Sequence, residues 1–254
     1  MQVFNEQYLA GKRVLVTGAS SGIGRQTAIA LAACGARVCA SGRDATRLQA
    51  TLDALAGTGH GLLPLDLNGD DTITEAIQAD AKAHGAFHGA FHSAGVSMVR
   101  PIKMCKRKQF DDVFASSVQS ALAIARAMSL RGVMEDGGSL VFMSSVAGLR
   151  GQTGMSLYSA AKAAMDGMTR SLAVEFAPRG IRVNAVCAGA IETPMHSSLL
   201  TTLNDDSIEA YRSKHLLGFG QPDDVANAVT FLMGQGGRWM TGTSLVLDGG
   251  YTVR

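Results

Sequence analysis

Three side chains that can exchange protons stand close together in the middle of the chain. Tyr158 and Lys162 are four residues apart in a stretch, 157–176, with helical spacing of apolar residues, so they share one face of the predicted helix. Ser145 directly follows an apolar run at 140–144 that is typical of a strand. A phenol with its ordinary pKa of about 10 holds its proton firmly, and a neighbouring ammonium group lowers that pKa. Together the three residue types could pass a proton to or from a substrate oxygen.

A glycine-rich segment near the amino terminus joins a predicted strand, 13–17, to a predicted helix, 23–34. Gly18 allows a tight turn, Gly22 lets the backbone approach a pyrophosphate, and Gly24 permits close packing of the helix. The amino end of the helix adds N–H donors and the positive end of its dipole. This context predicts a dinucleotide site. The residues expected to form it are Gly18, Ser20, Ser21, Gly22, Ile23 and Gly24.

The end of the second predicted strand, 37–41, bears on which dinucleotide is bound. An acidic residue there usually binds the ribose hydroxyls of NAD, whereas an arginine can pair with the 2′-phosphate of NADP. Gly42 stands where the acidic residue is expected, so Arg43 predicts NADP(H) as the cofactor. Asp44 leaves an alternative open, because it could accept a ribose hydroxyl or cap the following helix.

Short apolar runs alternate with longer helical stretches along all 254 residues. That alternation, with 46% hydrophobic residues, predicts an α/β fold: a single doubly wound Rossmann-type domain over 1–254, with a seven-stranded parallel sheet flanked by helices. The predicted strands are 13–17, 37–41, 62–65, 87–92, 140–144, 181–187 and 244–247. The predicted helices are 23–34, 44–56, 70–83, 107–130, 157–176 and 222–233.

Three residues separate Gly18 from Gly22, and this spacing together with the Tyr158 and Lys162 pair resembles the classical short-chain dehydrogenase/reductase family, in its 3-oxoacyl-ACP reductase-like branch. The resemblance extends over essentially the whole chain. It implies an NADP(H)-dependent oxidoreductase that transfers a hydride between nicotinamide and a carbonyl or secondary alcohol. It further implies that Ser145 holds the substrate oxygen, Tyr158 is the general acid in reduction and the base in oxidation, and Lys162 tunes Tyr158 and binds the nicotinamide ribose.

The resemblance also assigns cofactor contacts beyond the glycine segment. These are Asp66 and Leu67 at the adenine, Ala94 and Gly95 beside the ribose, and Ile191 and Thr193 at the nicotinamide carboxamide.

Three positions depart from the family pattern. Ser117 replaces an Asn that holds a water linking the lysine to solvent, and a hydroxyl can hold a water with fewer fixed donors. His92 stands in place of an Asn and is interpreted as a hydrogen-bonded structural group, while Ala188 replaces a Pro. These departures leave a second function open: a catalytically impaired sensor that binds the dinucleotide with the same fold.

The stretch 192–221 shows no clear periodicity and is interpreted as a substrate lid. The substrate itself stays open between a small ketone, a sugar or polyol, and a 3-oxoacyl group. Acidic residues at 135–136, and Val174 where a basic side chain would help docking, argue against an acyl-carrier-protein partner. The residues expected to line the substrate pocket are Thr153, Met155, Met195, His196 and Leu199.

Bulk properties limit the partners. A net charge of +2 gives no indication of nucleic acid, and no apolar run approaches the roughly 20 residues of a membrane helix. Four cysteines without paired or metal-ligand spacing, and no basic and apolar leader at the amino end, predict a cytoplasmic protein without a metal site. The family resemblance implies a homotetramer or homodimer, formed through the helices at 107–130 and 157–176.

Overall fold

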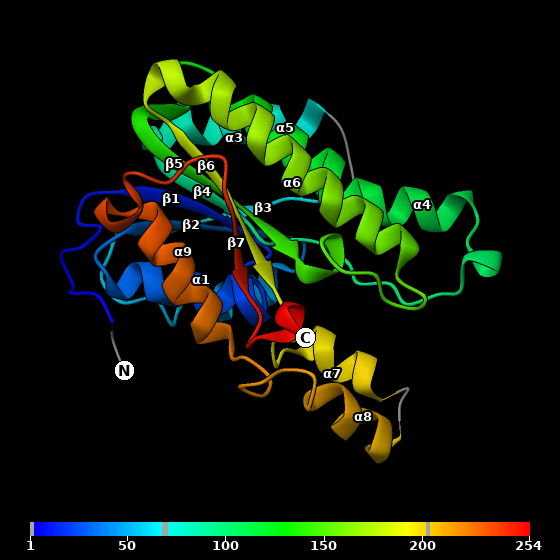
Figure 1. Cartoon of the computed structure of the whole chain (residues 1–254). Coiled ribbons are helices and arrows are strands. Elements are labelled where there is room, and N and C mark those ends of the chain that lie inside the picture. Colours follow the sequence, from blue (N-terminus) through cyan, green and yellow to red (C-terminus); the bar gives the residue numbers. More distant parts are fainter. Residues whose placement is uncertain (1–2, 68–70, 202–203) are drawn as a thin grey trace.

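A parallel β-sheet crosses the middle of the molecule (Figure 1), a computed structural model that describes residues 3–67, 71–201 and 204–254. Within these residues the sheet has seven strands in the order β3-β2-β1-β4-β5-β6-β7. Every neighbouring pair is parallel, which confirms the predicted doubly wound sheet. The strands are β1 Arg13–Thr17, β2 Arg37–Gly42, β3 Gly61–Pro64, β4 Phe87–His92, β5 Met134–Ser145, β6 Arg182–Ala188 and β7 Ser244–Leu247.

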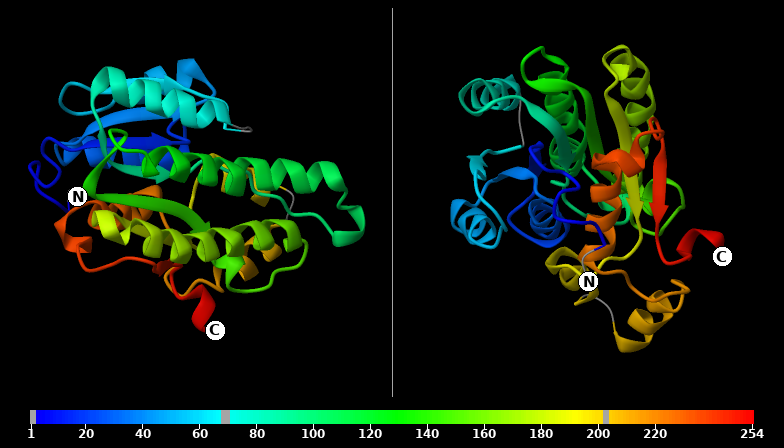
Figure 2. Two further views of the ribbon diagram at one scale, coloured as in Figure 1. Left: turned by 90° about the horizontal axis from the view of Figure 1, so that it is seen from above. Right: turned by 90° about the vertical axis from the view of Figure 1, so that its left-hand side faces the viewer.

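Helices cover both faces of the sheet (Figures 1 and 2). On one face, α1 (Gly22–Ala33), α2 (Ala45–Leu52) and α9 (Pro222–Met233) pack over Val14 and Val16 of β1. On the other face, α3 (Asp71–His84), α5 (Ser120–Ser129) and α6 (Ser156–Phe176) pack over Leu15. Successive strand residues point to opposite faces, so a strand buried on both sides must be apolar throughout. No helix in the described part of the chain has the length and apolar composition to cross a bilayer.

The strand order reverses between β1 and β4, where Thr17 pairs with His92 at the carboxyl ends of the two strands. Ligands of open α/β sheets bind in the crevice at such a reversal. The glycine-rich segment follows β1, Ala94 and Gly95 follow β4, and Ser145 ends β5. The topology therefore brings the predicted site residues to one edge of the sheet.

The predicted helix at 107–130 is interrupted. It consists of α4 (Arg107–Phe114), a π-helical turn (Ala115–Gln119) and α5. Hydroxyl groups compete with the helical hydrogen bonds here: Ser116 Oγ donates to the carbonyl of Asp112 at 2.9 Å, and Ser120 Oγ donates to that of Ser116 at 2.9 Å. Such turns often mark functional sites, and this one contains Ser117.

The expectation of an irregular stretch at 192–221 is wrong. It contains α7 (Pro194–Leu200) and α8 (Asp205–Arg212), and residues 202–203 lie outside the described residues. Thr193 caps α7 by accepting from His196 N at 3.2 Å, and Asn204 caps α8 by accepting from Ser207 N at 2.9 Å. The two ends of the stretch meet, since Glu192 N donates to Gly220 O at 2.8 Å. Its function as a lid stays a prediction.

Candidate active site

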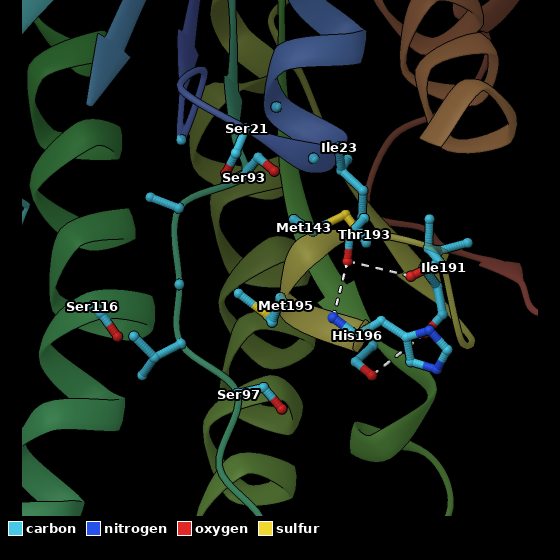
Figure 3. Close-up of a pocket in the computed structure, with 18 of the residues that line it drawn as sticks. Ser21, Ile23, Ser93, Ser97, Ser116, Met143, Ile191, Thr193, Met195 and His196 are labelled. Carbon is cyan, nitrogen blue, oxygen red and sulfur yellow. Dashed lines mark hydrogen bonds between the residues drawn. The ribbon is translucent and has the colours of Figure 1, made fainter. Parts of the chain in front are cut away.

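A cavity of about 490 Å³ opens at the carboxyl ends of the strands. Figure 3 shows Ser21 and Ser93 towards one end of it and Ser97 and Met195 towards the other. We call these the cofactor end and the substrate end. The predicted site residues that line the cavity are Gly18, Ser20, Ser21, Gly22, Ile23, Gly24, Arg43, Asp66, Leu67, Ala94, Gly95, Ser145, Tyr158, Lys162, Ile191 and Thr193.

Gly18 and Gly24, at the cofactor end, have no room for side chains. Gly18 has a φ of +67°, and a Cβ on it would lie 2.9 Å from Ala94 N. A Cβ on Gly24 would lie 2.3 Å from Gly18 O, so the helix α1 and the turn before it pack backbone to backbone. Ser21 makes no side-chain hydrogen bond to the first turn of α1, which leaves the N–H groups there open to an anionic ligand. These features fit the pyrophosphate of a dinucleotide.

Two arginines line the same end, Arg43 and Arg47. Asp44 is the N-cap of α2: its carboxylate accepts from Arg47 N at 3.0 Å and from Arg47 Nε at 2.7 Å. These hydrogen bonds lower the pKa of Asp44. The sequence left two roles open for Asp44, ribose acceptor and helix cap, and in the structure Asp44 is the helix cap. Arg47 was not predicted as a site residue from the sequence, although a cation three residues after a capping aspartate is placed to pair with it.

Ser145 and Tyr158 meet where the two ends of the cavity join. Ser145 ends β5 in extended conformation; its Oγ accepts from Ala147 N at 3.2 Å and donates to Ala188 O at 3.4 Å, and its hydroxyl lowers the pKa of Tyr158. Tyr158 belongs to the first turn of α6. Ser144 also lines the cavity, but its hydroxyl donates to the Lys162 carbonyl at 3.2 Å. The geometry favours Ser145 as the serine that contacts substrate.

Lys162 lies behind Tyr158, with Nζ 5.5 Å from the centre of the phenol ring and donating to Met143 O at 2.8 Å. Burial lowers the pKa of Lys162 to about 8. Burial also raises the pKa of Tyr158, and the hydrogen bond from Ser145 offsets only part of that rise. The expected lowering of the pKa of Tyr158 is therefore wrong for this structure, because desolvation by burial outweighs the effect of Ser145. At neutral pH Tyr158 is a phenol.

Ser117 is fully buried and lies outside the cavity wall, which Ser116 lines instead. A Cβ on Gly95 would lie 3.4 Å from Ser117 Oγ and 3.8 Å from Lys162 Nζ, so Gly95 separates Ser117 from the cavity beside Lys162. Ser117 Oγ has no hydrogen-bond partner among the described residues. Its part in a proton relay stays a prediction.

His92 is confirmed as a hydrogen-bonded structural residue. Its Nδ1 lies 2.8 Å from Thr17 Oγ1 and its Nε2 lies 3.0 Å from Ser120 Oγ. Burial lowers the pKa of His92 to about 3, so the ring is neutral. It ties β1 and β4 to the helix that carries the π-helical turn.

The substrate end is lined by Met155, Met195, His196 and Leu199 as predicted, whereas Thr153 is not part of it. Side chains from distant segments complete it. The residues missed from the sequence are Val96, Ser97, Gln152 and Tyr211. No aspartate, glutamate, lysine or arginine of the described chain lines this end.

Comparisons with known proteins agree with this architecture. The family model described as enoyl-(acyl carrier protein) reductase matches residues 18–252. Glucose 1-dehydrogenase of Gluconobacter oxydans is 35% identical, covering 96% of this chain and 93% of its own length. The 3-oxoacyl-[acyl-carrier-protein] reductase of Vibrio cholerae is 34% identical, with 95% and 98% covered.

A short-chain dehydrogenase from Burkholderia cenocepacia, solved in complex with NADP, superposes with a TM-score of 0.88 at 32% identity, covering 96% of this chain and 99% of its own. These relatives are dehydrogenases and reductases, so the alternative of an impaired sensor has no support among them. The chain belongs to the classical short-chain dehydrogenase/reductase family, in its 3-oxoacyl-ACP reductase-like branch, and is an oxidoreductase of that family.

Proposed function

We propose that this chain is an NADP(H)-dependent oxidoreductase that interconverts a carbonyl group and a secondary alcohol. One observation carries the proposal: Ser145, Tyr158 and Lys162 line the same cavity as the glycine-rich turn at 18–24. A proton donor and a dinucleotide site thus open onto one space, as carbonyl reduction requires.

The residues at the junction have separate roles. Reduced nicotinamide supplies a hydride when it is bound. Ser145 and Tyr158 hydrogen-bond the carbonyl oxygen, and Tyr158 transfers its hydroxyl proton to that oxygen as negative charge develops there. The Lys162 ammonium stabilises the tyrosinate that remains. Ile191 and Thr193, on the same wall, orient the nicotinamide (Figure 3).

Tyr158 holds the proton that reduction consumes. Burial raises the pKa of this phenol, so its acid form is the one present at neutral pH before the reaction. In the oxidative direction the same group acts as the base.

Arg43 and Arg47 select NADP(H) in this proposal. Both line the cofactor end, and a guanidinium pairs well with a phosphate group. Asp44 is engaged as a helix cap, which leaves no acidic residue at this strand end to hold the ribose hydroxyls of NAD. The NADP found in the Burkholderia cenocepacia neighbour supports the same choice.

The substrate end favours an uncharged carbonyl compound, such as a small ketone or a sugar. The wall there combines Met155, Met195 and Leu199 with the amide of Gln152. The names of the relatives include both a sugar dehydrogenase and a reductase of carrier-bound acyl groups. Val174 is exposed but apolar, and the Arg179 guanidinium is already paired with Asp136, so neither position offers a free basic group to an acidic carrier.

We further propose a homotetramer or homodimer assembled through α4, α5 and α6, because Phe110, Leu122 and Val174 are exposed apolar side chains on these helices. Light scattering after size-exclusion chromatography measures this directly. A monomer would contradict it. The cytoplasmic location stays a prediction.

The test of the function is oxidation of NADPH and NADH by the purified chain with a panel of diketones, keto-sugars, sugar acids and acyl thioesters. We expect turnover with at least one uncharged carbonyl compound, and a higher kcat/KM with NADPH than with NADH. Tight NADPH binding without turnover on any compound would favour the sensor instead.

A further inference from the structure

A buried carboxylate lies one helical turn beyond Lys162. Asp166, on the inner face of α6, is 4% exposed. Its Oδ1 accepts from Ser244 Oγ of β7 at 2.9 Å and from Cys187 Sγ of β6 at 3.4 Å. Its Oδ2 has no hydrogen-bond partner in the described part of the chain. A Cβ on Gly148 would lie 3.1 Å from Oδ2, so the turn after Ser145 closes the space.

A charge buried in this way is costly unless an opposite charge compensates it. Lys162, 5% exposed, lies four residues earlier on the same face of α6, and its Nζ donates to Met143 O at 2.8 Å. The other titratable groups near the pair are neutral at pH 7. Burial and Asp166 raise the pKa of the Cys187 thiol to about 12, burial raises the pKa of Tyr158, and burial holds His92 uncharged.

We propose that Asp166 is a positioning residue whose carboxylate is the counter-charge of Lys162, and that it keeps this buried amine in its ammonium form at neutral pH. Ser244 and Cys187 hold the carboxylate in place from the two strands at that side of the sheet. The consequence for catalysis, that Tyr158 keeps an ammonium beside it, rests on the proposed function.

The electrostatic balance explains why the counter-charge is needed. Desolvation lowers the pKa of Lys162 to about 8, and Asp166 already opposes that fall. Without Asp166 the amine would lose its proton at still lower pH, where a neutral amine no longer stabilises a tyrosinate. Oδ2 of Asp166 makes no hydrogen bond in the described part of the chain, so hydrogen bonding alone does not compensate the buried charge.

The direct test is a pH titration of the ε-carbon resonance of Lys162 in the full-length protein, assigned by its loss in Lys162→Met. Asp166→Asn keeps an acceptor for Ser244 and removes the charge. We expect the titration midpoint of Lys162 to fall by about one pH unit in Asp166→Asn. Ser244→Ala is the matched control, because it removes one hydrogen bond and keeps the carboxylate, so its midpoint should stay near that of the wild type.

An unchanged midpoint in Asp166→Asn overturns the proposal. If that variant does not fold, Asp166→Leu, uncharged and of similar size, repeats the test. As a second readout, the alkaline limb of kcat/KM with NADPH should move to lower pH in step with the Lys162 midpoint, a shift that a merely structural role of Asp166 would not produce. A moved resonance with an unmoved alkaline limb would support the counter-charge and contradict the catalytic role of Lys162.

Discussion

The two ends of the cavity are built in different ways. At the cofactor end, the backbone packs against itself: Gly18 and Gly24 leave no space for a Cβ, and the other lining residues include those that follow β2, β3 and β4. At the substrate end, side chains of Gln152, Met195 and Tyr211 converge from separate segments. Steric limits of the backbone define the first end, whereas the second depends on how α7, α8 and the loop before α6 pack together.

This difference predicts where substitutions act. A change at the cofactor end should alter dinucleotide affinity through strain or lost charge, and a change at the substrate end should alter substrate preference only. The junction, where Ser145, Tyr158 and Lys162 lie, should govern the chemical step while both binding functions persist.

The largest effect is expected at the junction. Tyr158→Phe removes the proton donor, so kcat should fall by about 10²- to 10⁴-fold in steady-state assays, with NADPH affinity nearly unchanged. Ser117→Ala removes the buried hydroxyl beside Lys162 and should lower kcat by less than Tyr158→Phe does. Equal losses in the two variants would contradict the separate roles given to them.

At the cofactor end, Arg43→Ala should weaken NADPH binding by about 10- to 100-fold and leave NADH binding close to its original value, because only NADPH has the 2′-phosphate. Fluorescence titration with both nucleotides measures the two dissociation constants. A parallel loss for both would mean that Arg43 supports the site in some other way.

Two glycine-to-alanine substitutions test the effect of backbone strain at the cofactor end. Gly18→Ala places a Cβ 2.9 Å from Ala94 N at a φ of +67°, and we expect about a tenfold or greater loss of NADPH affinity. Gly42→Ala is the control, because its Cβ would make only ordinary contacts, the nearest at 3.5 Å to Leu48. Equal NADPH affinity in the two variants would show that steric crowding at Gly18 does not limit cofactor binding.

The pH profile probes the junction without mutation. The pKa of Lys162 is lowered to about 8, so the ammonium form is present below that pH and is lost as the pH rises through it. Carbonyl reduction at saturating NADPH should therefore decline above about pH 8, by up to tenfold per pH unit. A rate that stays level to about pH 10 would contradict the role of Lys162.

The smallest effect is expected at the substrate end. Met195 is half exposed, so Met195→Ala removes part of an apolar contact and should raise KM for a bulky ketone by about fivefold. NADPH affinity should not change. An equal shift in NADPH affinity would erase the distinction between the two ends.

Sequence patterns predicted the sheet well and the helical connections less well. β1, β4 and β7 begin and end at the predicted residues, because strands in a parallel sheet leave apolar runs bounded by turns. The break at 115–119 depends on serine side chains that bond to carbonyls and to His92, contacts that become visible only after folding. The helices α7 and α8 had visible caps at Thr193 and Asn204 but are too short for periodicity to reveal.

The site residues also differ in how well the sequence predicts them. The glycine segment and the Tyr158 and Lys162 pair are contiguous motifs, so their meeting at one cavity could be predicted. Arg47 and Tyr211 reach it only through tertiary packing, and Thr153 does not line it, although Gln152 and Met155 of the same loop do. The raised pKa of Tyr158 results from burial, which residue spacing alone does not report.

The most direct measurement follows a labelled hydride. Wild-type protein is given NADPH deuterated at the transferable position of the nicotinamide and an uncharged ketone, and the alcohol is analysed by mass spectrometry and NMR. We predict alcohol with deuterium on the carbinol carbon from the wild type, and almost no alcohol in the same time from Tyr158→Phe although NADPH still binds. Unlabelled alcohol from the wild type, or labelled alcohol formed at the wild-type rate by Tyr158→Phe, would contradict the claim that Tyr158 completes a reduction begun at the bound cofactor.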